Sequence, residues 1–171
     1  VACFVIHGNR DFLLGRGFCD RTGCRLLPDP VVLELHGERV LVTHGDALCT
    51  DDHSYQELRS KVRTADWQRR FLALPFDIRD RFASQARAGS KAHIKRTAPQ
   101  IQDVNPDAVI NAFRATHVRR IIHGHTHRPG VHDLQVDGEP AQRIVLGAWY
   151  EEGSYLAYEN GRYELRTLPR G

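Results

Sequence analysis

Short apolar segments separated by polar loops run through most of the chain, and they predict strands. Residues 1–6 are apolar at every position, which is typical of a strand that is buried on both faces. Asp137-Gly138 and Asn160-Gly161 predict tight hairpin turns between the last strands. Further strands are predicted where aliphatic and β-branched residues cluster, at residues 31–35, 39–44, 119–123, 131–136, 142–149, 154–159 and 163–168.

In several other segments the apolar residues recur at the spacing of a helix. Residues 12–20 predict a short helix, and residues 54–98 have helical spacing with no strand signal, divided by Pro75. Asn105 followed by Pro106 supplies a helix N-cap and a proline at the first helical position, so a further helix begins there. The order of elements predicts an α/β fold in two layers with a helical insertion.

The composition is that of a globular domain, and the basic residues are concentrated in the helical insertion. The chain has 171 residues, of which 41% are hydrophobic and 26% charged, as in an ordinary globular domain. No apolar run approaches the ~20 residues that a membrane-spanning helix needs. Residues 57–96 hold 11 basic and 4 acidic side chains in a chain of net charge +3. This excess suggests an anionic partner, although a charge run is also typical of a solvated helix face.

Three polar motifs each follow an apolar strand: GNRD at 8–11, HGD at 44–46 and GHTH at 124–127. Because the carboxyl ends of strands in an α/β sheet open onto one crevice, we expect these loops to meet. Imidazole and amide oxygen suit divalent manganese, iron or zinc. Each motif alone is equally typical of a hydrogen-bonded loop, but three together favour a metal site. The candidate side chains are Asn9, Asp11, His44, Asp46, His125 and His127.

In this order, GNRD, HGD and GHTH resemble the calcineurin-like metallophosphoesterases. The longer strings FVIHGNRDFLLG, VTHGDALCTDD, IIHGHTHRP and RIVLGAW resemble, over essentially the whole chain, the bacterial UDP-2,3-diacylglucosamine diphosphatases of lipid A biosynthesis. The resemblance implies a metallophosphoesterase-like α/β sandwich with a helical cap over 54–98. It also implies hydrolysis of UDP-2,3-diacylglucosamine to UMP and 2,3-diacylglucosamine 1-phosphate, with two divalent metal ions, of which Mn²⁺ is the first expectation.

The resemblance also implies roles for individual residues. Asn9, His44 and His125 match ligands of the second metal, and His127 matches a ligand of the first. Arg10 stands where many metallophosphoesterases have a catalytic histidine. An arginine keeps its proton at neutral pH, so we expect Arg10 to contact phosphate rather than to act as a general acid. Asn9, Arg10 and His125 form the expected catalytic set.

Substrate contacts follow from the same resemblance. We expect a lipid-linked sugar nucleotide as substrate, peripheral association with the cytoplasmic face of the inner membrane, and no nucleic-acid partner, since no nucleic-acid-binding module is recognisable. Asp52 has the alternative role of N-cap for the next helix. Thr97 stands where the family often has a lysine, a part that Lys95 could take. The expected substrate-binding residues are Asn9, Arg10, Asp52, Ser90, Ile94, Lys95, Thr97 and His125.

Part of the family pattern is missing from the sequence. The family's D-x-H and G-D motifs, which supply most ligands of the first metal, precede GNRD, but here only six strand residues and His7 do so. The chain also contains no methionine. We therefore expect an N-terminally incomplete enzyme, the carboxyl-terminal part of a longer domain, with little turnover by itself. The alternatives are a metallophosphoesterase for another phosphodiester or nucleotide, and a non-catalytic phosphoesterase-like binding module.

Overall fold

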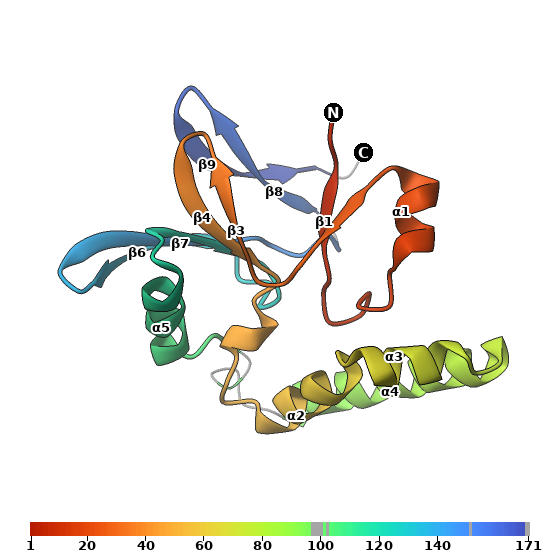
Figure 1. Ribbon diagram of the computed structural model, residues 1–171. Helices are drawn as coiled ribbons and strands as arrows, with labels where there is room; N and C mark the ends of the chain where they lie inside the picture. Colours follow the sequence, from red (N-terminus) through yellow and green to blue (C-terminus); the bar gives the residue numbers. More distant parts are fainter. Residues whose placement is uncertain (97–100, 102, 151, 170–171) are drawn as a thin grey trace. The chain divides into compact units, whose positions relative to one another are not determined.

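The computed structural model describes residues 1–96, 101, 103–150 and 152–169, with side chains omitted for residues 91–96 (Figure 1). The chain divides into two compact units. Unit 1 comprises Val1–Leu48 and Pro106–Gly171, and unit 2 comprises Cys49–Asn105.

Unit 1 is built on mixed β-structure, and its central sheet has five strands in the order β3-β4-β5-β7-β6. β4, β5 and β7 run parallel to one another, and the outer strands β3 and β6 are antiparallel to their neighbours. Two further pairs, β1-β2 and β8-β9, form separate two-stranded sheets. The strands are β1 (Phe4–Ile6), β2 (Arg25–Leu27), β3 (Val31–Leu35), β4 (Glu38–Thr43), β5 (Arg120–His123), β6 (Gly130–Val136), β7 (Glu139–Val145), β8 (Gly153–Glu159) and β9 (Arg162–Leu168). The helices of this unit are α1 (Arg16–Thr22), the 3₁₀ turn η1 (Asp46–Leu48) and α5 (Pro106–Thr116).

Apolar side chains on one face of the five-stranded sheet form a core under the β8–β9 hairpin. Val40, Ile122 and Ile144 come from the three parallel strands and are buried together. Leu156 of β8 and Tyr163 of β9 pack against them. The hairpin therefore forms one layer of unit 1 and the sheet forms the next.

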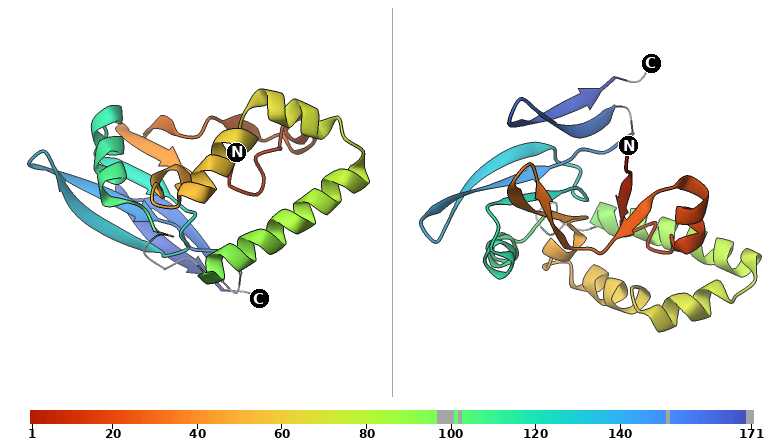
Figure 2. Two further views of the ribbon diagram at one scale, coloured as in Figure 1. Left: turned by 90° about the horizontal axis from the view of Figure 1, so that it is seen from below. Right: turned by 45° about the horizontal axis from the view of Figure 1, so that its top comes forward.

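The helix α5 covers the opposite face of the same sheet, as Figure 2 shows. Ile121 precedes Ile122 along β5, so its side chain points to the other face, and it is fully buried. α5 buries Val109 and Phe113. Helix, sheet and hairpin thus stack in three layers, which confirms the predicted α/β class, although two layers were expected.

The hairpin turns of the carboxyl-terminal strands agree with the prediction. Asp137 and Gly138 have φ values of 57° and 81°, and Asn160 and Gly161 have 52° and 79°. Positive φ at both central residues is the type I′ geometry that matches strand twist. The strands do not form one continuous meander, because β7 joins β5 in the central sheet whereas β8 and β9 pair only with each other.

The prediction for the first strand was wrong in one respect. β1 is not buried on both faces, and Phe4 is 50% exposed. Its only neighbour is β2, in a parallel pair of three residues each, and two strands offer too little surface to cover both faces of either one. The sequence analysis did not predict β2, because three residues are too few to display a periodicity. The short helix expected over 12–20 is α1, which begins at Arg16.

Unit 2 consists of the helices α2 (His53–Val62), α3 (Ala65–Leu72) and α4 (Phe76–Arg96). Pro75 lies between α3 and α4, as the sequence predicts, and Thr64 adds a second break by accepting a hydrogen bond from the backbone of Trp67 at 3.3 Å. α3 and α4 lie side by side, with the rings of Phe71 and Phe82 5.1 Å apart (Figure 1). Within the described residues, no helix combines the length and apolar character needed to cross a bilayer.

The last residue of unit 2 is hydrogen-bonded to a residue near the start of the unit. The side-chain amide of Asn105 donates a hydrogen bond to a carboxylate oxygen of Asp51 at 2.9 Å. The helical segment expected over 54–98 therefore lies inside a unit whose two chain ends are tied together.

Candidate metal centre

Three parallel strands of unit 1 end beside one another, and a loop leaves each of them. β5 ends at His123, whose carbonyl accepts a hydrogen bond from the backbone of Leu146 at 2.8 Å. The backbone of Gly124 donates to the carbonyl of His44 at 3.1 Å. The loops that follow β4, β5 and β7 are thus connected at one edge of the sheet, the place where the carboxyl ends of parallel strands form a crevice.

Two of the expected metal ligands and the GNRD loop meet at this edge. Nδ1 of His125 lies 3.1 Å from Nε2 of His44, and the backbone amide of Asn9 donates to the same Nε2 at 3.3 Å. Nitrogen ligands bind a divalent cation at about 2.0–2.2 Å, so two of them on one cation stand roughly 3 Å apart. The separation of the two imidazole nitrogens fits joint coordination.

The surroundings favour the neutral form of His125 and His127. Burial first and the neighbouring His44 second lower the pKa of His125 from 6.5 to about 4, while the buried Asp46 acts in the opposite direction. Partial burial and the positive charge of Arg10 both lower the pKa of His127. Since a metal binds the neutral form of histidine, both side chains are in the coordinating state at neutral pH.

A buried hydrogen-bonded histidine fixes the loop that carries GHTH. His123, the last residue of β5, is 1% exposed. A guanidinium nitrogen of Arg143 lies 3.0 Å from Nε2 of His123, and Nδ1 lies 2.9 Å from the carbonyl of Gly124. Because a guanidinium only donates, Nε2 accepts and Nδ1 donates. The chain Arg143–His123–Gly124 therefore fixes one neutral tautomer and the start of the loop.

Gly45 lies against this histidine and leaves no room for a side chain. Its φ is 104°, and a Cβ there would lie 2.7 Å from Nδ1 of His123 and 3.1 Å from the carbonyl oxygen of Gly124. The backbone after β4 therefore approaches the GHTH loop more closely than any other residue type permits.

Two positioning residues were missed in the sequence. Asp29 accepts hydrogen bonds from the hydroxyl of Thr43 at 2.6 Å and from the backbone of His44 at 2.9 Å, and so holds the end of β4. Arg143 holds His123 from β7. Both act on partners more than ten residues away, so no local pattern marks them; Asp29-Pro30 by itself is typical of an ordinary turn.

Asp52, an expected substrate contact, lies in unit 2 as the N-cap of α2. Its carboxylate accepts from the backbone of Tyr55 at 3.1 Å and from the hydroxyl of Ser54 at 3.0 Å. This is the capping role considered as the alternative, and it satisfies a backbone donor at the start of the helix.

The other expected cap residues also belong to the segment of unit 2. Ser90 is half-buried on α4. The backbone of Ile94 and Lys95 continues the same helix, but their side chains lie outside the described residues, as does the whole of Thr97. Their part in substrate binding remains a prediction.

No family model matches the chain. Among solved structures the chain is similar to an archaeal phosphodiesterase, with 15% identity and a TM-score of 0.42 over 96% of this chain and 68% of that one. It is also similar to vacuolar protein sorting 29 from Cryptosporidium parvum, with 9% identity and a TM-score of 0.35 over 83% and 56% of the two chains. TM-scores this low do not assign the chain to a family, so the assignment depends on sequence similarity.

Curated relatives are much more similar in sequence. The UDP-2,3-diacylglucosamine hydrolase of Enterobacter sp. (strain 638) is 52% identical over 169 residues, which are 99% of this chain and 70% of that protein. Proteins of the same name from Klebsiella pneumoniae and Escherichia coli O127:H6 are 51% and 50% identical over the same shares. The chain belongs to the UDP-2,3-diacylglucosamine hydrolase family. The resemblance of the motifs to this family is confirmed.

In this member of the UDP-2,3-diacylglucosamine hydrolase family, the metal ligands are not assembled as a complete set. Among the residues that the structure describes, no group of three or more histidine, cysteine, aspartate or glutamate side chains is arranged to hold a metal ion. His44 and His125 form a pair, and Asn9 reaches it through its backbone. The ligand set of these three residues and His127 therefore stays a prediction.

Replacing Gly45 tests the contact between the two loops of this hydrolase. We expect Gly45→Ala to lower the free energy of unfolding by about 3 kcal/mol, because the new Cβ clashes with His123 and the residue keeps a strained φ. Gly138→Ala is the matched control: its φ is 81° but nothing lies within 4 Å of its Cβ position, so about 1 kcal/mol is expected. Urea unfolding measures both, and equal losses would contradict the close approach.

The low pKa of His125 predicts that stability of the metal-free protein falls between pH 6.5 and 4. In that range the unfolded chain binds a proton on His125 and the folded chain does not, so added protons favour unfolding. The contribution is constant above pH 6.5, and about 3 kcal/mol is lost by pH 4. Urea unfolding in a chelator measures the slope.

A matched pair of variants isolates that contribution. His125 and His117 both have left-handed φ, 67° and 53°, which asparagine tolerates. We expect His125→Asn to remove this part of the pH dependence and His117→Asn to keep it. An unchanged slope in His125→Asn would show that another group is responsible.

Proposed function

We propose that this chain serves the hydrolysis of the diphosphate of UDP-2,3-diacylglucosamine to UMP and 2,3-diacylglucosamine 1-phosphate, with little turnover expected of these 171 residues by themselves. The observation that carries the proposal is the meeting of Asn9, His44 and His125 at one strand edge, in a chain 52% identical to a hydrolase of that name. The same motifs that define the resemblance thus supply the groups that meet in space.

Asn9, His44 and His125 would hold one divalent cation, and His127 would belong to a second. The 3.1 Å separation of the imidazole nitrogens and the lowered pKa values of His125 and His127 support this assignment. Imidazole and amide donors accept manganese, iron or zinc, and Mn²⁺ is our first choice. When bound, such a cation supplies Lewis acidity and a water with a lowered pKa.

Arg10 would bind the phosphoryl oxygens of the substrate. Its charge is close enough to His127 to lower the pKa of that imidazole, so a guanidinium stands beside the centre. A guanidinium offers several donors in a planar fork, which suits two phosphate oxygens at once. Arg10 therefore orients the diphosphate and offsets its charge, and it transfers no proton.

Unit 2 would act as the cap for the acyl chains and as the contact with the inner-membrane surface. Large apolar side chains are exposed around the α3–α4 connection, among them Leu72 at 47% and Phe76 at 74%. The guanidinium of Arg79 lies 5.8 Å from the ring of Phe76. Apolar side chains among arginines suit an anionic lipid surface. On this proposal the enzyme works at the cytoplasmic face of the membrane.

Turnover tests the reaction. We expect the complete product of the gene that encodes this chain to release UMP from UDP-2,3-diacylglucosamine when Mn²⁺ is supplied. His125→Asn should lower kcat at least about 100-fold, because it removes a ligand of the cation that supplies the attacking water. His117→Asn, the matched substitution on the exposed surface, should keep full activity. Liquid chromatography of released UMP measures both.

A substrate panel separates the competing functions. Faster hydrolysis of a soluble phosphodiester, such as bis(4-nitrophenyl) phosphate, than of the diacyl sugar nucleotide would favour a phosphodiesterase of another specificity. Binding of the sugar nucleotide with no turnover of either compound would favour a binding module.

Membrane contact by unit 2 is tested with vesicles of phosphatidylethanolamine and phosphatidylglycerol. We expect Phe76→Ser to lower the partition coefficient about tenfold, because one exposed apolar ring no longer enters the lipid interface. Val131→Ser, at a side chain of unit 1 that is 50% exposed, is the control and should leave partitioning unchanged. Equal binding by all three proteins in a sedimentation assay would contradict the assignment to unit 2.

A further inference from the structure

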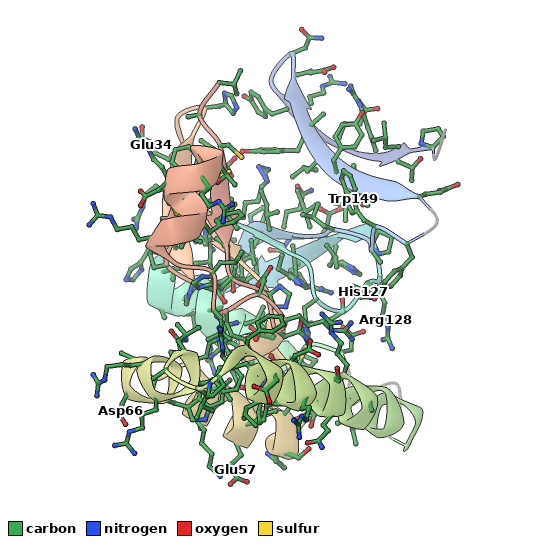
Figure 3. All side chains as sticks on the ribbon, turned by 90° about the vertical axis from the view of Figure 1, so that its right-hand side faces the viewer. Glu34, Glu57, Asp66, His127, Arg128 and Trp149 are labelled. Carbon is green, nitrogen blue, oxygen red and sulfur yellow. The ribbon has the colours of Figure 1, made fainter. Side chains whose placement is uncertain are left out.

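Two large aromatic side chains are exposed beside the metal centre. Trp149 and Tyr150 follow β7 in the loop that begins at the same sheet edge as GHTH, and they are 66% and 64% exposed. Figure 3 shows Trp149 on the side of unit 1 that also carries His127 and Arg128. Adjacent exposed rings of this size are costly in water unless they bind something.

The loop holds the indole of Trp149 in a fixed position. Its Nε1–H donates to the carbonyl of Ser154 at 2.7 Å, and the hydroxyl of Ser154 accepts from the backbone of Gly147 at 2.9 Å. Ser154 itself is buried. The ring packs on Gly153, where a Cβ would come within 3.5 Å of its atoms. The only polar group of the indole is thus satisfied within the loop, and what remains for a ligand is an apolar ring face.

Tyr150 follows Trp149 directly in the chain and contacts the centre. Its ring meets the ring of His127 edge to face, with centroids 5.5 Å apart. His127 in turn lies near the positive charge of Arg10. Two exposed aromatic rings on one loop therefore adjoin a cationic site within one unit, a pairing that matches a ligand with a planar ring attached to a phosphate.

We propose that Trp149 and Tyr150 form a stacking platform for the nucleobase of a nucleotide whose phosphate lies at the centre of His44, His125 and His127. The inference rests on the proposed function and deepens it, since it assigns the uracil end of the sugar nucleotide to the loop after β7. A ring face can stack on any planar base, and it makes no hydrogen bonds to the base edges. The platform supplies affinity for the nucleotide half and little discrimination among bases.

Calorimetric binding of two ligands tests the platform. UMP and ribose 5-phosphate share the sugar and the phosphate but only UMP has a base. With Mn²⁺ present, we expect the complete gene product to bind UMP about five- to a hundredfold more tightly, the range that stacking of one base gives. Trp149→Ala should remove most of this ratio while leaving ribose 5-phosphate unchanged. Trp149→Phe keeps a ring but loses the bond to Ser154, and it should keep most of the ratio.

Each other result has a defined meaning. Equal affinity of the unaltered protein for the two ligands overturns the platform, and so does a ratio that survives Trp149→Ala. A loss of vesicle binding in Trp149→Ala with an unchanged ratio also overturns it and assigns the rings to the membrane. A ratio removed by Trp149→Ala in a protein that does not hydrolyse UDP-2,3-diacylglucosamine supports the platform and overturns the proposed reaction alone.

Discussion

The site depends on the parallel alignment of β4, β5 and β7. Each strand contributes its last residue to one edge, and backbone hydrogen bonds between the loops carry the alignment beyond the strands themselves. A shift of one register step would turn His123 out of the core and separate His44 from His125. The apolar contacts of Val40, Ile122 and Ile144 stabilise the same register. The packing of the sheet and the geometry of the site therefore depend on the same strand alignment.

Hydrogen bonds fix the protonation state and the position of polar groups at this edge of the sheet. His123 is neutral because Arg143 donates to one of its nitrogens and the loop carbonyl accepts from the other. Asp29 holds the end of β4 from outside the motif. Asp29 and Arg143 are not among the expected metal ligands, yet they hold the loops that carry those ligands.

The sequence predicted most of the elements and the residues that meet, but not the support around them. Strand and turn patterns located β3 to β9 because alternation and Asn-Gly or Asp-Gly turns are local signals. The meeting of HGD and GHTH followed from the rule for strand ends. GNRD reaches the same place from β1, which belongs to a separate two-stranded sheet, so the rule does not account for its position. Asp29 and Arg143 were missed because their partners are distant in sequence. Burial of β1 was misjudged because an apolar run does not reveal how many strands flank it.

The hydrogen bond between Asp51 and Asn105 affects how freely the inserted helices can change during evolution. A segment whose two ends are already held together adds little loop-closure entropy to the domain that receives it. To unit 1, the whole of Cys49–Asn105 is topologically equivalent to a short surface connection between η1 and α5. The helices could therefore lengthen, shorten or be exchanged for others while the sheet that holds the histidines stays the same.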